Sequence, residues 1–356
     1  MSKKMRAVQW VDDAKYELRE VDCPVCGDDD VIIKIEAAGI CGGDMHAYNG
    51  VMKFGNRKPV TMGHEFAGTI VEMGKNVDPY WKVGDRVVSE NTGDACGRCP
   101  ACASGNFVQC PNRKIIGGNF DGGFAEYTRI PGRILKMYPN CMFRIPDNLD
   151  FPEATALEPS ANAYRAVFQE GHLMPGETVV VFGAGALGLL SIKMAKIGGA
   201  ANIILVAMGP DEPVRVPMAM EFGVKHVIYS DRIDNVAAEV AKVTDENGVQ
   251  LVIDAAGVPV VMRDAIELVS HMGRIVRIGL GGKPFDSSLN PITMKSITIY
   301  GHNGYNTECW RNCIALAAAG ILNLKPLITR IQPLEEFEDG FESYKRQEAT
   351  KIILVP

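Results

Sequence analysis

Residues 179–188 read VVVFGAGALG, and this stretch decides how the chain of 356 residues folds. Its apolar start predicts a buried strand, and the pattern G-x-G-x-x-G leads into a helical stretch that continues to residue 196. In such a turn Gly183 permits a tight bend, Gly185 lets the backbone approach a pyrophosphate, and Gly188 allows the helix to pack closely on the strand. Glycine-rich turns also occur in strand–helix units that bind nothing, so the interpretation depends on the surroundings.

The surroundings of the turn alternate between strands and helices. The strands expected after it cover residues 203–206, 227–229, 251–254 and 274–278, and the helices between them cover residues 214–222, 233–243 and 259–271. This alternation predicts a parallel sheet covered by helices on both faces, which a strand at 297–300 can extend. In this setting the turn predicts a dinucleotide site. Its candidate cofactor-binding residues are Gly183, Gly185, Ala186, Leu187 and Gly188.

The first 150 residues follow a different pattern. Short alternating segments between glycine turns lie at residues 31–36, 69–72, 86–88 and 124–130. Many short strands of this kind predict a β-rich, barrel-like domain. A helix near 308–320 and a strand at 351–355 close the chain.

The composition argues against several classes of function. Lys and Arg total 37 against 43 Asp and Glu, which gives a net charge of -6 without basic runs. Such a chain is a poor candidate for binding nucleic acid or an anionic membrane, and no apolar run approaches the roughly 20 residues of a membrane span. Because no secretory signal is evident, we expect a cytoplasmic protein whose ten cysteines are reduced.

Four of these cysteines are clustered and predict a metal site. Cys96, Cys99, Cys102 and Cys110 stand in the segment CGRCPACASGNFVQC. Four thiolates can close a tetrahedral zinc site without an open position, which is typical of a structural site that holds a loop together. An iron–sulfur cluster and incidental thiols are the alternatives.

A second set of candidate metal ligands is dispersed along the chain. Cys41 precedes two glycines, His64 and Glu65 lie in the segment GHEFAG, and Glu158 lies in ALEPSAN. One thiolate, one imidazole and carboxylates can bind zinc and leave a position for water or substrate. Spacing alone does not establish the site, because a buried His64 or a helix-capping Glu158 explains each residue separately.

The residue that usually distinguishes the two nicotinamide cofactors is missing. An acid at the end of the second strand would bind the adenosine ribose, but residues 203–206 are followed by Ala207. Asp211 and Glu212 follow shortly, and Arg215 can meet a 2′-phosphate, unless all three are solvated loop charges. The residues leave NAD or NADP open, and NAD is the favoured expectation.

In combination these motifs resemble the zinc-dependent medium-chain dehydrogenases, close to the sorbitol (polyol) and threonine dehydrogenase branch. The matching motifs, in chain order, are Cys41 with Asp44 and His46, GHE at 63–65, the four cysteines at 96–110, LEP at 157–159 and GAGALG at 183–188. The resemblance covers nearly the whole chain, and the combination is far more specific than any single motif.

The resemblance implies an α/β protein with two domains. A GroES-like β-barrel catalytic domain is expected at residues 1–156 and 297–356, with a structural zinc loop at 91–113. A Rossmann domain with a doubly wound parallel sheet is expected at 157–296. By family habit we expect a homodimer or homotetramer with a small-molecule alcohol as its partner.

The resemblance also implies roles for single residues. Cys41 and His64 match catalytic zinc ligands, and Glu65 and Glu158 match the two acids that supply or exchange the remaining protein coordination in the polyol branch. Ethanol-type enzymes have a cysteine where Glu158 stands. His46 matches the outer end of a proton relay.

On the cofactor side, Lys351 resembles a basic position near the pyrophosphate. Ile278 begins the segment 278–281, which with residues 255–257 matches loops that line the nicotinamide side.

Two departures from the family pattern concern substrate and cofactor preference. The family usually has Ser or Thr two residues after the zinc cysteine, where this chain has Gly43. A water, Glu158 or a neighbouring substrate hydroxyl would then replace the relay hydroxyl. The loop after Ala207 is also longer than is typical.

We therefore predict zinc-dependent transfer of hydride between a secondary alcohol of the polyol class and NAD(P), with one catalytic and one structural zinc per chain. Threonine or a vicinal diol is the alternative substrate. A non-catalytic zinc- and nucleotide-binding protein is the alternative of a different class.

Overall fold

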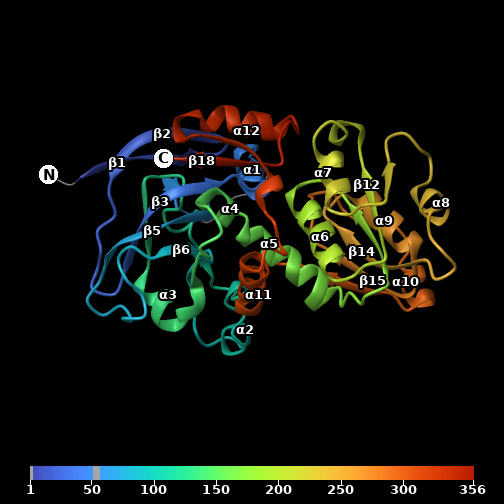
Figure 1. Cartoon of the computed structure of the whole chain (residues 1–356), viewed down its shortest axis with the longest axis horizontal. Coiled ribbons are helices and arrows are strands. Elements are labelled where there is room, and N and C mark those ends of the chain that lie inside the picture. The colour runs from blue at the N-terminus through green and yellow to red at the C-terminus, as the bar shows by residue number, and fades with distance from the viewer. Residues whose placement is uncertain (1–2, 51–56) are drawn as a thin grey trace. The chain divides into compact units, whose positions relative to one another are not determined.

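The computed structural model describes residues 3–50 and 57–356 and divides the chain into two units (Figure 1). The first combines Met1–Glu158 with Asn306–Pro356, and the second is Pro159–Tyr305. The chain returns to the first unit at Asn306 rather than at residue 297. Strand β16 (Thr298–Gly301) is hydrogen-bonded to β15 and therefore belongs to the sheet of the second unit.

The second unit is built on six parallel strands in the order β13-β12-β11-β14-β15-β16. Besides β16, the strands are β11 (Thr178–Phe182), β12 (Asn202–Ala207), β13 (His226–Tyr229), β14 (Val249–Asp254) and β15 (Val269–Arg277). The helices are α6 (Ala186–Ile197), α7 (Arg215–Glu221), α8 (Val236–Ala241), α9 (Pro259–Leu268) and α10 (Asn290–Lys295). Every residue of β11 is buried, as a central strand covered on both faces requires. The predicted doubly wound parallel sheet is confirmed.

The first unit is β-rich, as predicted. Its larger sheet has the order β10-β6-β5-β3-β18-β17 with β9 also paired to β3, and its smaller sheets are β2-β1-β4 and β7-β8. The strands are β1 (Lys4–Asp12), β2 (Lys15–Asp22), β3 (Val31–Gly39), β4 (Val60–Thr61), β5 (Glu65–Met73), β6 (Arg86–Ser89), β7 (Thr92–Asp94), β8 (Lys114–Ile115), β9 (Tyr127–Ile130), β10 (Met142–Arg144), β17 (Ile328–Pro333) and β18 (Lys351–Val355). The last strand lies between β3 and β17, so the C-terminal segment completes a sheet begun near the N-terminus.

Short helices connect these strands. They are α1 (Gly42–Tyr48), α2 (Pro100–Ala103), α3 (Gly132–Met137), α4 (Phe151–Thr155), α5 (Leu157–Tyr164), α11 (Thr307–Ala318) and α12 (Phe337–Lys345). A π-helix, Arg165–Glu170, continues α5, and 3-10 turns cover Phe107–Gln109, Pro139–Cys141, Gly209–Asp211, Lys325–Leu327 and Leu334–Glu336. Helix α5 contains the boundary between the two units.

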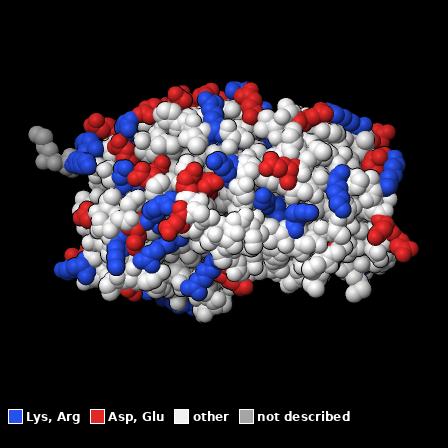
Figure 2. All heavy atoms as spheres, in the orientation of Figure 1, with Lys and Arg blue, Asp and Glu red and all other residues white. Residues whose placement is uncertain are grey.

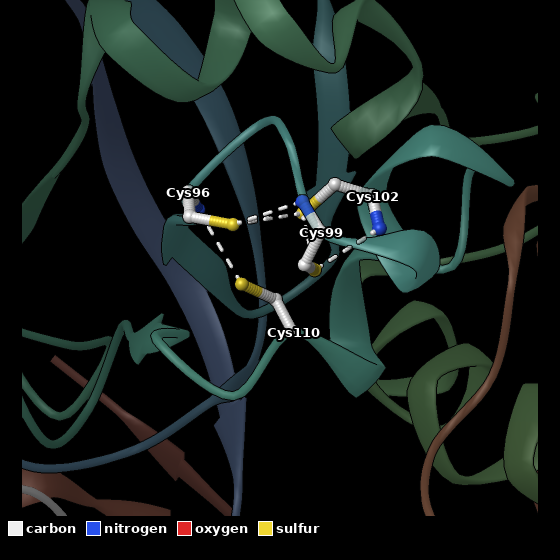
Figure 3. A group of neighbouring side chains, drawn as sticks. All are labelled: Cys96, Cys99, Cys102 and Cys110. Atoms are coloured by element: carbon white, nitrogen blue, oxygen red, sulfur yellow. Dashed lines mark hydrogen bonds between the residues drawn. The ribbon is translucent and has the colours of Figure 1, made fainter.

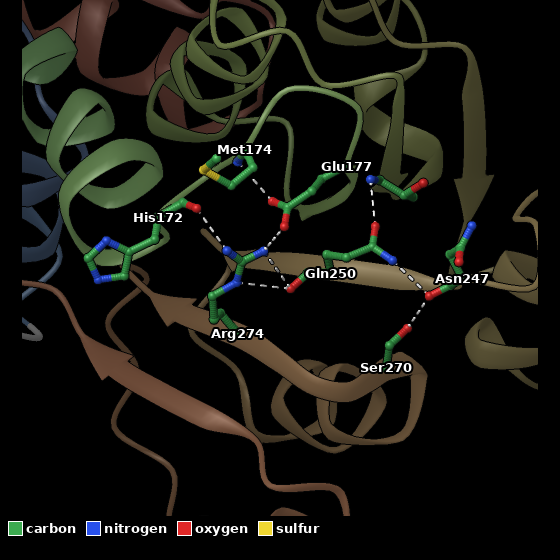
Figure 4. Close-up of polar contacts among 8 residues, drawn as sticks. His172, Met174, Glu177, Asn247, Gln250, Ser270 and Arg274 are labelled. Carbon is green, nitrogen blue, oxygen red and sulfur yellow. Dashed lines mark hydrogen bonds and ion pairs between the residues drawn. The ribbon is translucent and has the colours of Figure 1, made fainter.

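A polar network fixes the amino ends of the central strands in the second unit (Figure 4). The side chain of Gln250 accepts a hydrogen bond from the backbone of Thr178 at 2.8 Å. Arg274 donates to the carboxylate of Glu177 at 2.6 Å and to the carbonyl of His172 at 2.8 Å. These contacts hold β11, β14 and β15 in register, while the carboxyl ends of the strands, where such sheets bind ligands, remain clear of this network.

Acidic and basic side chains are intermixed on the face of the molecule drawn in Figure 2. Among residues 3–50 and 57–356, no helix is both long enough and apolar enough to cross a membrane.

Candidate metal centres and cofactor site

The four clustered cysteines meet in the loop between β7 and β8 (Figure 3). Their sulfur atoms all lie within 4.8 Å of one another. The Sγ of Cys102 is 3.5 Å from that of Cys99 and 3.9 Å from that of Cys96. A tetrahedron of thiolates with metal–sulfur bonds of about 2.3 Å has edges of about 3.8 Å. The group therefore fits a closed four-thiolate metal site.

The surroundings of two of these thiols shift their pKa values in ways that favour a bound cation. Backbone amides of Arg98 and Cys99 donate to the sulfur of Cys96 and lower its pKa to about 6. Cys102 lies deeper, and burial raises its pKa to about 12. A thiolate at Cys102 is therefore unfavourable unless a positive charge lies beside it, which a metal ion supplies.

Arg113 closes the base of this loop, a contact that the sequence analysis missed. Its Nε donates to Thr92 Oγ1 at 2.9 Å, and its Nη2 donates to Asn91 Oδ1. The same Nη2 lies 3.7 Å from the carboxylate of buried Glu90. Both ends of the segment 91–113 are thereby tied together independently of the cysteines.

The second group of ligand side chains forms where β3 and β5 run side by side. Cys41 caps helix α1 just beyond the end of β3, and Glu65 begins β5, opposite Gly39 of β3. His64 immediately precedes that strand. The ligand atoms of Cys41, His64 and Glu65 lie within 4.8 Å of one another. Three residues separated in the sequence are thus brought to one point by strand pairing.

Asp44 orients the histidine of this group. It is fully buried, its Oδ2 accepts a hydrogen bond from the Cys41 amide at 3.0 Å, and its Oδ1 lies 3.3 Å from His64 Nδ1. Burial alone would lower the pKa of His64, but the negative charges of Asp44 and Cys41 raise it well above its usual value. A ring held through Nδ1 leaves Nε2 as the metal ligand, the arrangement typical of metal-bound histidines.

Lys351, expected on the cofactor side, lies beside Glu65 in the first unit. Its Nζ contacts Glu65 Oε2 and donates to the carbonyl of Ile40 at 3.2 Å. The side chain is only 1% exposed, and burial lowers the pKa of Lys351 to about 8. Within the first unit, the ammonium group thus contacts one of the three candidate ligands.

The other oxygen of Glu65, Oε1, is buried and has no hydrogen-bond partner among the described residues. A buried carboxylate oxygen without a partner is costly. A metal ion held with Cys41 and His64 would satisfy it, so the donor set fits a zinc site.

Two further residues expected at this site lie outside the three-residue group. Glu158, in α5, is buried. Burial raises the pKa of buried Glu90, and the negative charge of Glu158 adds to that increase. His46 is half-buried in the last turn of α1. Among the described residues, the group that contains Cys41 brings together the ligand atoms of Cys41, His64 and Glu65.

The glycine turn between β11 and α6 has the geometry of a phosphate-binding turn. Gly183 has a positive φ of 93°. A Cβ atom at Gly188 would lie 1.9 Å from the carbonyl oxygen of Gly183, whereas one at Gly185 would meet no atom within 4 Å. Gly185 is the N-cap of α6 and no side chain caps it. The amides of Ala186 and Leu187 therefore open a helix whose N-terminus is available to an anion.

Two of the three charged residues after β12 are buried and paired with each other, and are not solvated loop charges. Arg215 and Asp211 are buried, and Nη1 of the arginine lies 3.1 Å from Oδ1 of the aspartate. Asp211 Oδ2 also accepts the amide of Met208 at 3.1 Å. Only Glu212, exposed and paired with Arg232, is a solvated loop charge. Arg215 is thus held by a carboxylate, which competes with a 2′-phosphate.

Comparison with known proteins supports one family. The description "Alcohol dehydrogenase GroES-like domain" matches residues 27–140, and "Zinc-binding dehydrogenase" matches residues 186–319. The uncharacterized zinc-type alcohol dehydrogenase-like protein YdjL of Escherichia coli K12 is 40% identical over 345 residues, which cover 95% of each chain. D-arabitol-phosphate dehydrogenase of Enterococcus avium is 32% identical and covers 99% of this chain and 98% of its own.

A solved structure agrees with these matches. The crystal structure of 2R,3R-butanediol dehydrogenase from Bacillus subtilis has a TM-score of 0.88 at 31% identity and covers 99% of both chains. The chain therefore belongs to the zinc-dependent medium-chain dehydrogenases. It is an enzyme, an oxidoreductase with a GroES-like unit and a Rossmann unit.

Proposed function

We propose that this dehydrogenase oxidises a secondary hydroxyl group of a polyol and transfers the hydride to NAD. The observation that carries the proposal is the donor set Cys41, His64 and Glu65, which combines one thiolate, one imidazole and one carboxylate. The relatives support the substrate class, because one is named for a polyol phosphate and another for a diol. Threonine remains an alternative to be tested with the same assay.

The proposed ligands of the catalytic zinc are Cys41 Sγ, His64 Nε2 and Glu65 Oε1, with Glu158 as an acid that exchanges with Glu65. When bound, zinc supplies Lewis-acid chemistry by polarising the substrate hydroxyl. Asp44 fixes the His64 ring, and Lys351 holds the second oxygen of Glu65. Three protein ligands held in this way leave a position for substrate or water.

The proton path of this chain lacks the usual side-chain hydroxyl. Gly43 offers only its amide, which donates to Cys41 Sγ at 3.4 Å. Glycine has no side-chain group that could relay a proton, so we propose that water or Glu158 takes the proton from the substrate. His46, half-buried at the end of α1, passes it to solvent.

The proposed dinucleotide site uses the open N-terminus of α6 for the pyrophosphate, with Gly183, Gly185 and Gly188 shaping the turn. NAD is favoured over NADP because Arg215, the nearby cation, is buried against Asp211. Ile278, directly after β15, is proposed to border the nicotinamide half. A second, structural zinc is proposed for Cys96, Cys99, Cys102 and Cys110.

The proposed setting is a homo-oligomer in the cytoplasm. All ten cysteines are free thiols, which is typical of a reducing compartment. Strand β16 lies at the edge of its sheet, with Ile299 38% exposed and Met294 of the preceding helix 77% exposed. An edge strand with apolar neighbours favours pairing with another copy, and a homodimer or homotetramer would cover it.

The test is an initial-rate assay of nicotinamide reduction on the zinc-loaded enzyme. The panel contains tetritols, pentitols, hexitols, their phosphates, vicinal diols and threonine, each with NAD and with NADP. Turnover of one polyol class with NAD is the expected result. Turnover confined to threonine or to diols overturns the polyol proposal, and preference for NADP overturns the cofactor proposal. Variants C41A and H64A, which each remove a ligand, are the inactive controls.

A further inference from the structure

Asp254 stands at the point of the second sheet where ligands are expected, but the proposed function does not use it. It is the last residue of β14 and lies opposite Phe182, the residue before the glycine turn. The strand order reverses between β11 and β14, and open parallel sheets bind their ligands at the carboxyl ends of such strands. Asp254 is fully buried there.

Asp254 holds two loops at once. Its Oδ1 accepts hydrogen bonds from the amides of Ala256 at 3.1 Å and Gly257 at 2.7 Å, in the loop after β14. Its backbone carbonyl accepts the amides of Ile278 and Gly279, both at 2.9 Å, in the loop after β15. One residue thus anchors the start of both loops at the carboxyl edge of the sheet.

The two loops are also interlocked with each other. Gly257 has a positive φ of 73°, and a Cβ atom there would lie 2.5 Å from the carbonyl carbon of Gly279. Arg277 donates from Nη2 to the carbonyl of Gly257 at 2.8 Å, and its Nη1 lies 3.8 Å from Asp254 Oδ2. A shift of the first loop therefore moves the second, and the contacts of Asp254 set the position of both.

We infer that Asp254 is a positioning residue for the dinucleotide, acting through the loops 255–257 and 278–281. The inference rests on the proposed function, in which Ile278 of the second loop borders the nicotinamide half of the cofactor. Loops already ordered before binding spare the cofactor the entropic cost of ordering them. Asp254 therefore contributes to cofactor affinity without touching the cofactor, and Arg277 supports it from the neighbouring strand.

Two substitutions separate the hydrogen bonds from the charge. D254N keeps an oxygen that can accept the amides of Ala256 and Gly257, whereas D254A removes the acceptor. Asp234, exposed and in the same unit, provides the matched control D234A. Binding of NADH, and of NADPH in parallel, is measured by fluorescence titration on the zinc-loaded enzyme. Zinc content and thermal unfolding are recorded for every variant.

We expect D254A to weaken dinucleotide binding about tenfold or more, and D254N and D234A to stay within about threefold of wild type. The KM for the dinucleotide rises in D254A, while the KM for the alcohol and the zinc content stay unchanged. A general loss of stability would not raise the KM for the dinucleotide alone, and D254N would not restore it.

R277M provides a second test in case D254A fails to fold. It leaves Asp254 in place, removes the bond to Gly257 and is expected to weaken NADH binding about threefold to tenfold. Wild-type affinity in folded D254A, or in R277M, overturns the inference. If the wild-type enzyme binds neither NADH nor NADPH, the proposed function itself fails, and the same titration shows which of the two has failed.

Discussion

Lys351 and Glu65 form a buried ion pair over Gly39. Lys351 begins β18 and Glu65 begins β5, and both strands pair with β3, which ends at Gly39. A Cβ atom at Gly39 would lie 2.8 Å from Glu65 Oε2 and 2.9 Å from Lys351 Cε, so a side chain at this position would displace the pair. Because the pair occupies Oε2, Oε1 is the oxygen available to the proposed metal ion.

Replacing Lys351 should destabilise the fold, because it leaves the buried carboxylate of Glu65 without the ammonium group. In K351M the carboxylate of Glu65 keeps its charge and burial but loses its partner. We expect the free energy of unfolding to fall by about 3–5 kcal/mol, the range found when one member of a buried pair is removed. Urea denaturation of the metal-free protein measures it, because the proposed zinc ion at Oε1 would give Glu65 a second cationic partner.

The matched control for K351M is R346A. Arg346 pairs with Glu348 on the surface, where both side chains are about half exposed, so no measurable change in stability is expected. Equal stability of K351M and wild type would show that Glu65 does not depend on Lys351.

Asp44 should tune the metal affinity of the catalytic group. D44A removes the carboxylate beside His64 Nδ1 and the acceptor of the Cys41 amide. Loss of such a partner typically lowers metal affinity about 10-fold to 100-fold. Competition with a chromophoric zinc chelator measures the affinity. D44N, which retains an acceptor oxygen, should lie between D44A and wild type, and a D44A affinity equal to wild type would contradict the role given to Asp44.

Removing one of the four clustered cysteines should abolish zinc binding in that loop and leave the proposed catalytic zinc site occupied. In C99S one thiolate of the four is missing, so the zinc content should fall from two ions per chain to one, with a lower thermal unfolding temperature. C26S is the control, because Cys26 lies outside the cluster and its sulfur donates to the carbonyls of Gly27 and Asp30. Elemental analysis of the purified variants decides the point, and two zinc ions in C99S would refute a four-thiolate site.

Local patterns predicted much of this structure. The glycine turn, the alternation of strands and helices and the cysteine cluster each lie within short segments, where spacing determines geometry. The Lys351–Glu65 pair could not be predicted, because its members are 286 residues apart and meet only through the pairing of β18 and β5 with β3. For the same reason spacing did not reveal that Asp44 lies beside His64.

Burial is the other property that the sequence did not reveal. Arg215 was identified as a charge near the second strand, but its pairing with Asp211 depends on how the 3-10 turn Gly209–Asp211 folds back. The strand predicted near 297–300 belongs to the sheet of the second unit, as β16. Hydrogen bonding to β15 decides that membership.

The glycine turn allows packing and ligand binding to be separated by two substitutions. In G188A the new methyl group would lie 1.9 Å from the carbonyl oxygen of Gly183, so α6 must shift and stability should fall by about 1–3 kcal/mol or more. In G185A the methyl group meets no protein atom within 4 Å, so stability should change little. The same methyl group stands where a pyrophosphate would approach, and NADH binding should weaken about tenfold or more.

Thermal unfolding and NADH titration of both variants, made side by side, test the two roles. G188A should lose stability and binding together, because the helix N-terminus moves with the helix. G185A should lose binding alone. Wild-type affinity in G185A would mean that the pyrophosphate does not lie over the N-terminus of α6, whereas wild-type stability in G188A would mean that the close approach of helix and strand is not needed for the fold.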